Sequence, residues 1–237
     1  MYHVTLSPLG FNARQVADGV YDTEYRAFFQ IVKDSGAHFI FRTMHEANGS
    51  WYSWSGDPEN FKLAWRHIWN LSREIGLTDQ NVLFDFSVNS EDLPSSDGTI
   101  GGPMVFCTPE YKAKNHCKSF EDFYPGDGYV DIVGVTLYNW GRGRAENWAT
   151  WKTFSELLNN EKMNTFARMK SYKKGIFIDE VGTTAVDFTG TWSREKVQDA
   201  YENQTDQKNQ WILDMKQELT KHPEIIGALY FNRDRTQ

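Results

Sequence analysis

Apolar residues along this chain gather in six short runs, and the stretches between them carry apolar positions at a helical spacing. The runs are nearly continuous in apolar character, which is typical of strands covered on both faces, as in a parallel sheet. The expected strands cover residues 2–7, 38–42, 82–87, 130–138, 175–179 and 225–231.

The stretches between these runs predict helices that connect the strands. The expected helices cover residues 22–35, 58–75, 148–159, 164–172 and 193–221. The second of these has a favourable start, because Asp57 can cap its first turn and Pro58 suits the first helical position.

The repeated alternation of strand and helix predicts an α/β fold in a single domain over residues 1–237. No Gly-rich phosphate-binding motif follows any expected strand, so a (β/α)8 barrel of the TIM type is favoured over a doubly wound sheet. A closed barrel of this type needs eight strands. Because only six are expected here, the barrel is predicted to be incomplete.

The longest stretch without a regular pattern covers residues 89–128 and contains both cysteines, Cys107 and Cys117. A disulfide within this loop and two free thiols are both open interpretations. His116 beside Cys117 makes a poor zinc site, because further ligands at metal-like spacing are missing from the sequence.

Composition changes this picture mainly through the aromatic residues, which make up 15% of the chain and include nine Trp. Flat, partly exposed rings suit stacking on sugar faces, whereas most of the Phe are expected in the core. The formal net charge is −7 and no stripe of Lys and Arg stands out, so neither nucleic acid nor an anionic membrane is an expected partner. No apolar run approaches the roughly 20 residues that a membrane-spanning helix needs.

Two carboxylates follow expected strands, at the end where barrels of this type carry their chemistry. Glu46 follows the second strand within FRTMHEANGSWYSW, and Glu180 follows the fifth within GIFIDEVG. A single Glu after a strand is more often a surface or helix-terminal charge. Two such residues, one of them among His, Asn and Trp, instead predict the carboxylate pair of a glycosidase. Asp179 competes with Glu180, and the alternation of side chains along a strand lets only one of them enter the site.

Three segments, in this order along the chain, resemble signatures of glycoside hydrolase family 26, a family of retaining (β/α)8 enzymes that includes β-mannanases. RTMHEANGSWYSW resembles the segment at the fourth barrel strand, YPGDGYVDIVGVTLYNW that at the sixth and GIFIDEVGT that at the seventh. The likeness extends over nearly the whole chain. By this register the chain carries strands three to eight, and we expect it to be a fragment of a longer enzyme or a naturally minimised relative.

The resemblance implies catalytic roles for residues at matching positions. Glu46 would be the general acid/base and Glu180 the nucleophile. Tyr138 would orient Glu180 by a hydrogen bond. Arg42 would supply a fixed positive charge that helps to keep the nucleophile ionised.

Other matching positions would bind the sugar. By resemblance, His45 and Asn48 would contact sugar hydroxyls, and Trp51 would line the cleavage point. Three further aromatic residues could either stack on sugar or pack within the protein, and both interpretations are open: Tyr52, Trp54 and Trp140.

The activity implied by the resemblance is endo-acting hydrolysis of β-1,4-mannosidic bonds in mannan, glucomannan or galactomannan, by a monomer that uses no metal or other cofactor. Two alternatives stay open: the same class of enzyme acting on mixed-linkage β-1,3-1,4-glucan or β-xylan, and a non-catalytic carbohydrate-binding relative. The resemblance also implies secretion to the periplasm, the cell surface or the medium, although the start MYHVTLSPLGF has no signal-peptide pattern.

Overall fold

The computed structural model describes residues 1–49, 51–92, 118–141, 150–160, 163–184, 195–196 and 205–231. Within these ranges, six strands follow one another in chain order in one sheet. They are β1 (Tyr2–Thr5), β2 (Phe39–Arg42), β3 (Val82–Asn89), β4 (Ile132–Asn139), β5 (Gly175–Thr183) and β6 (Ile225–Tyr230). The neighbours β1 and β2, β2 and β3, and β5 and β6 pair in parallel. All six predicted strands are confirmed, with ends that shift by a few residues.

Helices follow the strands, as the alternating pattern predicts. They are α1 (Ala13–Ala17), α2 (Asp22–Ser35), α3 (Pro58–Glu74), α5 (Phe120–Phe123), α6 (Phe154–Leu158), α7 (Thr165–Lys170) and α9 (Thr205–Leu219), with a 3-10 turn η1 at Asp127–Tyr129. None of the helices in the described ranges is both long and apolar enough to cross a lipid bilayer.

Three helices differ from the sequence prediction, two of them because of how their first turns are capped. In the described part of the predicted helix at 148–159, α6 begins only at Phe154. The Thr153 hydroxyl accepts from the Glu156 N–H and the Glu156 carboxylate accepts from the Thr153 N–H, which fixes the start there. The short helix α1 was not predicted, and the same reciprocal capping between Asn12 and Gln15 begins it. The short helix α5 was not predicted either, because it lies within the stretch 89–128, where no regular pattern is expected.

The chain divides into two compact units. The first comprises residues 1–134 with 172–175, and the second comprises residues 135–171 with 176–237. The division falls within β4. A single domain over the whole chain stays a prediction.

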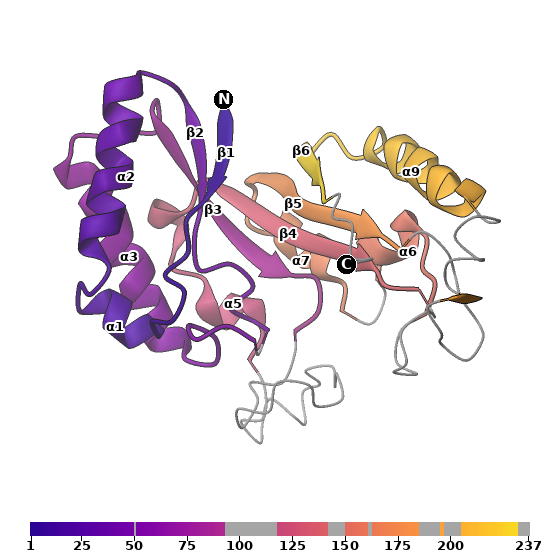
Figure 1. Cartoon of the computed structure of the whole chain (residues 1–237), viewed down its shortest axis with the longest axis horizontal. Helices are drawn as coiled ribbons and strands as arrows, with labels where there is room; N and C mark the ends of the chain where they lie inside the picture. Colours follow the sequence, from indigo (N-terminus) through magenta and orange to yellow (C-terminus); the bar gives the residue numbers. More distant parts are fainter. Residues whose placement is uncertain are drawn as a thin grey trace. The chain divides into compact units, whose positions relative to one another are not determined.

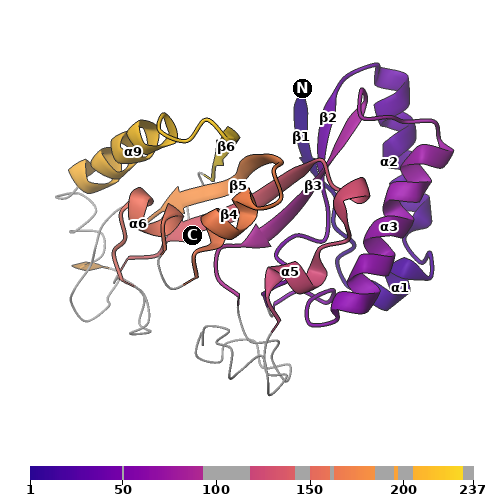
Figure 2. The same cartoon turned by 180° about the vertical axis from the view of Figure 1, so that it is seen from behind.

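The core of the first unit is aromatic and lies between its strands and the helices α2 and α3, which run side by side (Figures 1 and 2). Phe41 of β2 is fully buried, with ring centroids 5.2 Å from Phe29 of α2 and 5.3 Å from Phe84 of β3. Trp65 of α3 meets Phe84 edge-on at 6.2 Å. Such aromatic pairs stabilise by about 0.5–1.5 kcal/mol beyond their buried area. The packing therefore fixes β2 and β3, whose ends carry site residues.

The second unit is held by its own aromatic cluster. Trp211 of α9 is 2% exposed and lies edge-on to Phe154, the first residue of α6, at 5.7 Å. The Trp211 indole N–H also donates to the carbonyl of Lys152 at 2.8 Å. These contacts tie α9 to the start of α6, while most of β5 is buried.

Candidate active site

The segment that follows β2 is buried throughout and has an unusual backbone. β2 ends at Arg42, and Met44 and Glu46 then adopt φ angles of 42° and 54°, a left-handed conformation that is uncommon outside glycine. The Glu46 N–H donates to the Ser87 carbonyl on β3 at 2.9 Å, and the Gly49 N–H donates to the Glu46 carbonyl at 2.8 Å. Strained residues of this kind persist where the surroundings over-determine them, and they cluster at functional sites.

Glu46 is 8% exposed, and both of its carboxylate oxygens accept hydrogen bonds. The Trp51 indole N–H donates to Oε2 at 3.0 Å, and the Asn89 amide donates to Oε1 at 2.9 Å. A Cβ at Gly49 would lie 2.7 Å from the Trp51 ring, so glycine is needed there for the indole to reach the carboxylate. Donors of this kind favour the ionised carboxylate.

The rings of His45, Tyr52 and Trp54, close to Glu46 in the sequence, contact one another. His45 contacts the Ser7 hydroxyl through Nδ1 at 3.2 Å and the Tyr52 hydroxyl through Nε2 at 2.8 Å. The Tyr52 ring stacks on Trp54 with centroids 4.5 Å apart, and the Trp54 N–H donates to the His45 carbonyl at 2.9 Å. Trp54 is only 1% exposed, and stacking of this ring on sugar stays a prediction.

Asn48 uses its side chain to hold another part of the chain. Its Oδ1 accepts from the Asn89 N–H at 2.8 Å, and its Nδ2 donates to the Asn89 carbonyl and to the Asp92 carboxylate, both at 2.9 Å. Asn48 is 2% exposed. It thus ties the segment after β2 to the end of β3, and a direct contact of Asn48 with sugar stays a prediction.

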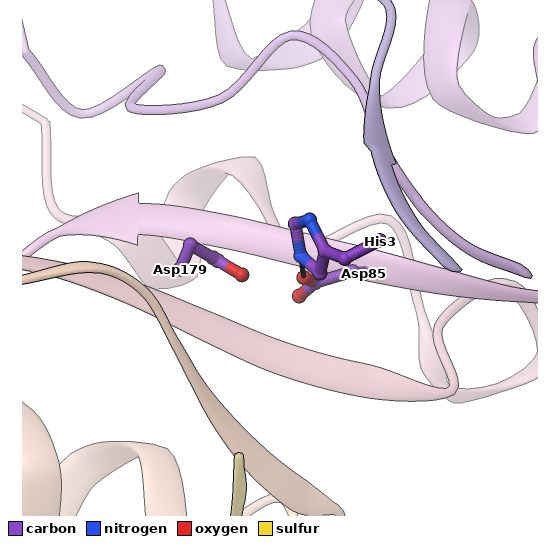
Figure 3. A group of neighbouring side chains, drawn as sticks. All are labelled: His3, Asp85 and Asp179. Carbon is purple, nitrogen blue, oxygen red and sulfur yellow. Dashed lines mark hydrogen bonds and ion pairs between the residues drawn. The ribbon is translucent and has the colours of Figure 1, made fainter. Parts of the chain in front are cut away.

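Buried charges accompany this segment. Arg42 is 3% exposed, and its Nε donates to the Ser87 hydroxyl at 2.9 Å. His3 of β1 and Asp85 of β3 form an ion pair at 3.2 Å when the imidazole is protonated (Figure 3). Asp179, also drawn in Figure 3, belongs to β5 of the second unit. The support that Arg42 is expected to give the nucleophile stays a prediction, since the two belong to different units.

The second unit carries the other expected carboxylate together with its orienting residue. Glu180 is half-buried on β5, and the Tyr138 hydroxyl, on the neighbouring strand β4, donates a hydrogen bond to its Oε2. The preceding Asp179 is 2% exposed, so the two carboxylates have different surroundings, as strand alternation requires. A Cβ at Gly182 would lie 3.2 Å from the Tyr138 ring, so the glycine leaves room for this side chain.

Two more rings flank Tyr138. Trp140 lies with its centroid 5.1 Å from that of Tyr138, and Phe231 lies edge-on at 5.9 Å. Phe231 is 39% exposed, and its N–H donates to the Val181 carbonyl at 2.8 Å. The rings form an aromatic surface near Glu180, and stacking of Trp140 on sugar stays a prediction.

The structure places the predicted site residues in two groups, one in each unit. The first unit holds Arg42, His45, Glu46, Asn48, Trp51 and Trp54, and the second unit holds Tyr138, Trp140 and Glu180. The separation of the two carboxylates, which distinguishes a retaining from an inverting site, stays a prediction.

Sequence reasoning missed two polar residues near the end of β3. Ser87 holds Arg42 and the Glu46 backbone, and Asn89 holds the Glu46 carboxylate. The signal was present, because the apolar run before them gives way to Ser87, Asn89 and Ser90 where a barrel strand carries its chemistry. Both cysteines lie outside the described residues, so the disulfide question stays open.

Known sequences resemble this chain over most of its length. The sequence model of glycosyl hydrolase family 26 matches residues 25–96 and 107–223, well over half of the chain. Endoglucanase H of Acetivibrio thermocellus is 24% identical over 241 residues, which cover 98% of this chain and 22% of that protein.

Solved structures show the same fold. The catalytic domain of a GH26 endo-β-1,4-mannanase from Bacillus sp. JAMB-750 matches with a TM-score of 0.54 and 18% identity, covering 94% of this chain and 52% of that one. A GH26 β-mannanase from Bacteroides ovatus matches with a TM-score of 0.52 and 19% identity, covering 99% of this chain and 61% of that one. The predicted incomplete (β/α)8 barrel is thereby confirmed, and the chain spans 22% of the curated relative and little more than half of these structures. The chain belongs to glycosyl hydrolase family 26.

Proposed function

We propose that this chain carries the catalytic residues of a retaining endo-glycoside hydrolase that cleaves β-1,4-mannosidic bonds in mannan, glucomannan or galactomannan. One observation carries the proposal: each of two carboxylates, one in the segment after β2 and one on β5, accepts a hydrogen bond from at least one side-chain donor. Trp51 and Asn89 hold Glu46, and Tyr138 holds Glu180. Membership of family 26 supports the reaction class.

The proposed reaction runs in two steps. First, a Glu180 oxygen bonds to the anomeric carbon while the glycosidic C–O bond breaks, and Glu46 gives its proton to the leaving oxygen. Second, Glu46 takes a proton from water, whose oxygen bonds to the anomeric carbon and releases Glu180. Both carboxyl groups return to their starting states, and the anomeric configuration is retained.

The side chains around each carboxylate fit these roles. Tyr138 donates to Oε2 of Glu180 and so orients the carboxylate that would attack the anomeric carbon. The two donors on Glu46 favour the ionised form that the second step needs. Burial of Glu46 to 8% exposure limits the water that competes for these hydrogen bonds.

The substrate has one specific alternative. The name of the relative Endoglucanase H motivates a test of mixed-linkage β-1,3-1,4-glucan, and β-xylan belongs in the same panel. Mannose and glucose differ only in the orientation of the hydroxyl at C2, so one or two hydrogen bonds decide between them.

We also propose that the protein is secreted and works as a monomer without a cofactor.

The test measures reducing sugar released from mannan, glucomannan, lichenan and xylan. We expect release from the two mannans, and its loss by at least about 100-fold in Glu46→Gln and in Glu180→Gln. Glu24→Ala, at an exposed position in the first turn of α2, is the matched control and should keep full activity. Full activity of either Gln variant would refute the assignment. Binding of mannan without any hydrolysis would favour a non-catalytic carbohydrate-binding protein instead.

A further inference from the structure

Asn89, the last residue of β3, presents its amide to Glu46 in a fixed orientation. Its Nδ2 donates to Glu46 Oε1 at 2.9 Å. Its Oδ1 accepts the Glu91 N–H, also at 2.9 Å. Turning the amide over would place oxygen against the carboxylate and NH2 against an N–H, so both contacts would be lost. The network therefore assigns the donor side of Asn89 to Glu46.

The backbone of Asn89 is held separately from its side chain. The Asn48 amide bonds to both the N–H and the carbonyl of Asn89, at 2.8 and 2.9 Å, although the two residues lie 41 positions apart. Asp92, which accepts from Asn48 at 2.9 Å, also accepts the Phe120 N–H at 2.9 Å. The backbone that carries the Asn89 donor is therefore fixed by the Asn48 amide. Because these bonds go to backbone atoms of Asn89, changing the Asn89 side chain leaves them in place.

We propose that Asn89 is a positioning residue for the acid/base carboxylate: it fixes the orientation of Glu46 and sets the pH at which this group gives up its proton. This inference rests on the acid/base role proposed above for Glu46. An N–H donor stabilises the ionised carboxylate and offers no acceptor to a proton on Oε1. Asn89 thereby biases Glu46 toward the form that activates water in the second step.

Two substitutions separate this role from a general effect on folding. Asn89→Ala removes the donor and keeps the backbone bonds to Asn48. Asn89→Asp keeps the acceptor for the Glu91 N–H and places a carboxylate oxygen where Nδ2 stood, 2.9 Å from Glu46 Oε1. Two carboxylates this close share a proton, so the protonated pair persists to a higher pH. Asn209→Ala, at an exposed position on α9, is the matched control.

The first measurement does not depend on activity. The side-chain carboxyl of Glu46, labelled with 13C and assigned by its loss in Glu46→Gln, is titrated by NMR in each variant. We expect the midpoint to rise by about 1 pH unit in Asn89→Ala and further in Asn89→Asp. It should stay unchanged in Asn209→Ala. Equal midpoints in the native chain and both Asn89 variants would overturn the inference.

The second measurement is the pH profile of kcat/KM on an aryl β-mannobioside whose leaving group requires protonation. The basic limb, which reports deprotonation of the general acid, should move up by the same shift as the NMR midpoint. A limb that stays in place while the midpoint moves would overturn the role in catalysis. Rescue of Glu46→Ala by azide tests the acid/base role separately, so failure of the proposed function is distinguished from failure of the role of Asn89.

Discussion

Tyr138→Phe isolates the hydrogen bond that orients the expected nucleophile. The substitution removes one oxygen and keeps the ring, which packs with Trp140 at 5.1 Å and Phe231 at 5.9 Å. What is lost is the O–H that donates to Oε2 of Glu180. Because Glu180 is half-buried, water can replace part of this bond in the free protein. We therefore expect little change in the free energy of unfolding.

The effect on the reaction should be much larger than the effect on stability. A hydrogen bond to a charged group contributes about 1.5–3 kcal/mol. At about 1.4 kcal/mol for each factor of ten, its loss in the transition state lowers kcat/KM by roughly 10- to 150-fold. The loss of about 150-fold applies if Tyr138 holds Glu180 in position as well as stabilising its negative charge.

The assay is the initial rate of release of a nitrophenol from a β-mannobioside, because a good leaving group makes the contribution of Glu46 small. Tyr230→Phe is the matched control: it removes a hydroxyl from β6 in the same unit and keeps the ring that faces the Lys208 ammonium at 5.7 Å. A value of kcat/KM for Tyr138→Phe within twofold of the native value would refute the reasoning.

Three further predictions concern the core, the second donor to Glu46 and a buried carboxyl. Phe41→Ala should lower the free energy of unfolding by about 3–5 kcal/mol, and Phe41→Leu by less than about 1.5 kcal/mol, in urea titrations; equal losses would contradict the aromatic core. Trp51→Phe should lower kcat/KM on mannan by roughly tenfold while the fold stays intact, because Glu46 loses an N–H donor. Burial raises the pKa of Asp131, so the folded chain binds its proton more tightly than the unfolded chain does and stability falls as pH rises above the usual Asp range. Asp131→Asn can still accept the Phe84 N–H, so it should make the free energy of unfolding fall less steeply with pH between pH 4 and 8. An unchanged dependence on pH would contradict this role of Asp131.

Much of the fold could be predicted from the sequence because its determinants are local. Continuous apolar runs gave the strands, and Asp57 with Pro58 gave the start of α3, where the Asp57 carboxylate accepts the Asn60 N–H. The starts of α1 and α6 depend on reciprocal capping pairs that a search for apolar periodicity does not register. Their bounds were therefore missed or misplaced.

The candidate site could be predicted only in its residue types. Motif and strand position pointed to Glu46, Glu180 and Tyr138. Nothing local indicated that Asn48 would turn inward to the end of β3, because its partner Asn89 lies 41 residues away. The left-handed backbone at Glu46 is likewise a property of the bonds formed with β3.

The sequence also did not predict which individual aromatic rings are buried. Tyr52 and Trp54 lie two positions apart in a segment rich in aromatic residues, and its composition gives no reason to expect different burial for the two rings. In the structure they stack at 4.5 Å, but only Trp54 is enclosed, at 1% exposure. Which ring faces solvent depends on the turn that follows β2, and no periodic pattern specifies that turn.

Covalent trapping of the glycosyl–enzyme intermediate tests the central claim most directly. A 2-deoxy-2-fluoro-β-mannobiosyl fluoride forms the intermediate and slows its hydrolysis, so the labelled residue can be identified by mass spectrometry of peptides. We predict a single adduct on Glu180, formed more slowly in Tyr138→Phe and absent from Glu180→Gln. An adduct on Glu46 or Asp179, or none in a chain that hydrolyses mannan, would contradict the proposed retaining mechanism.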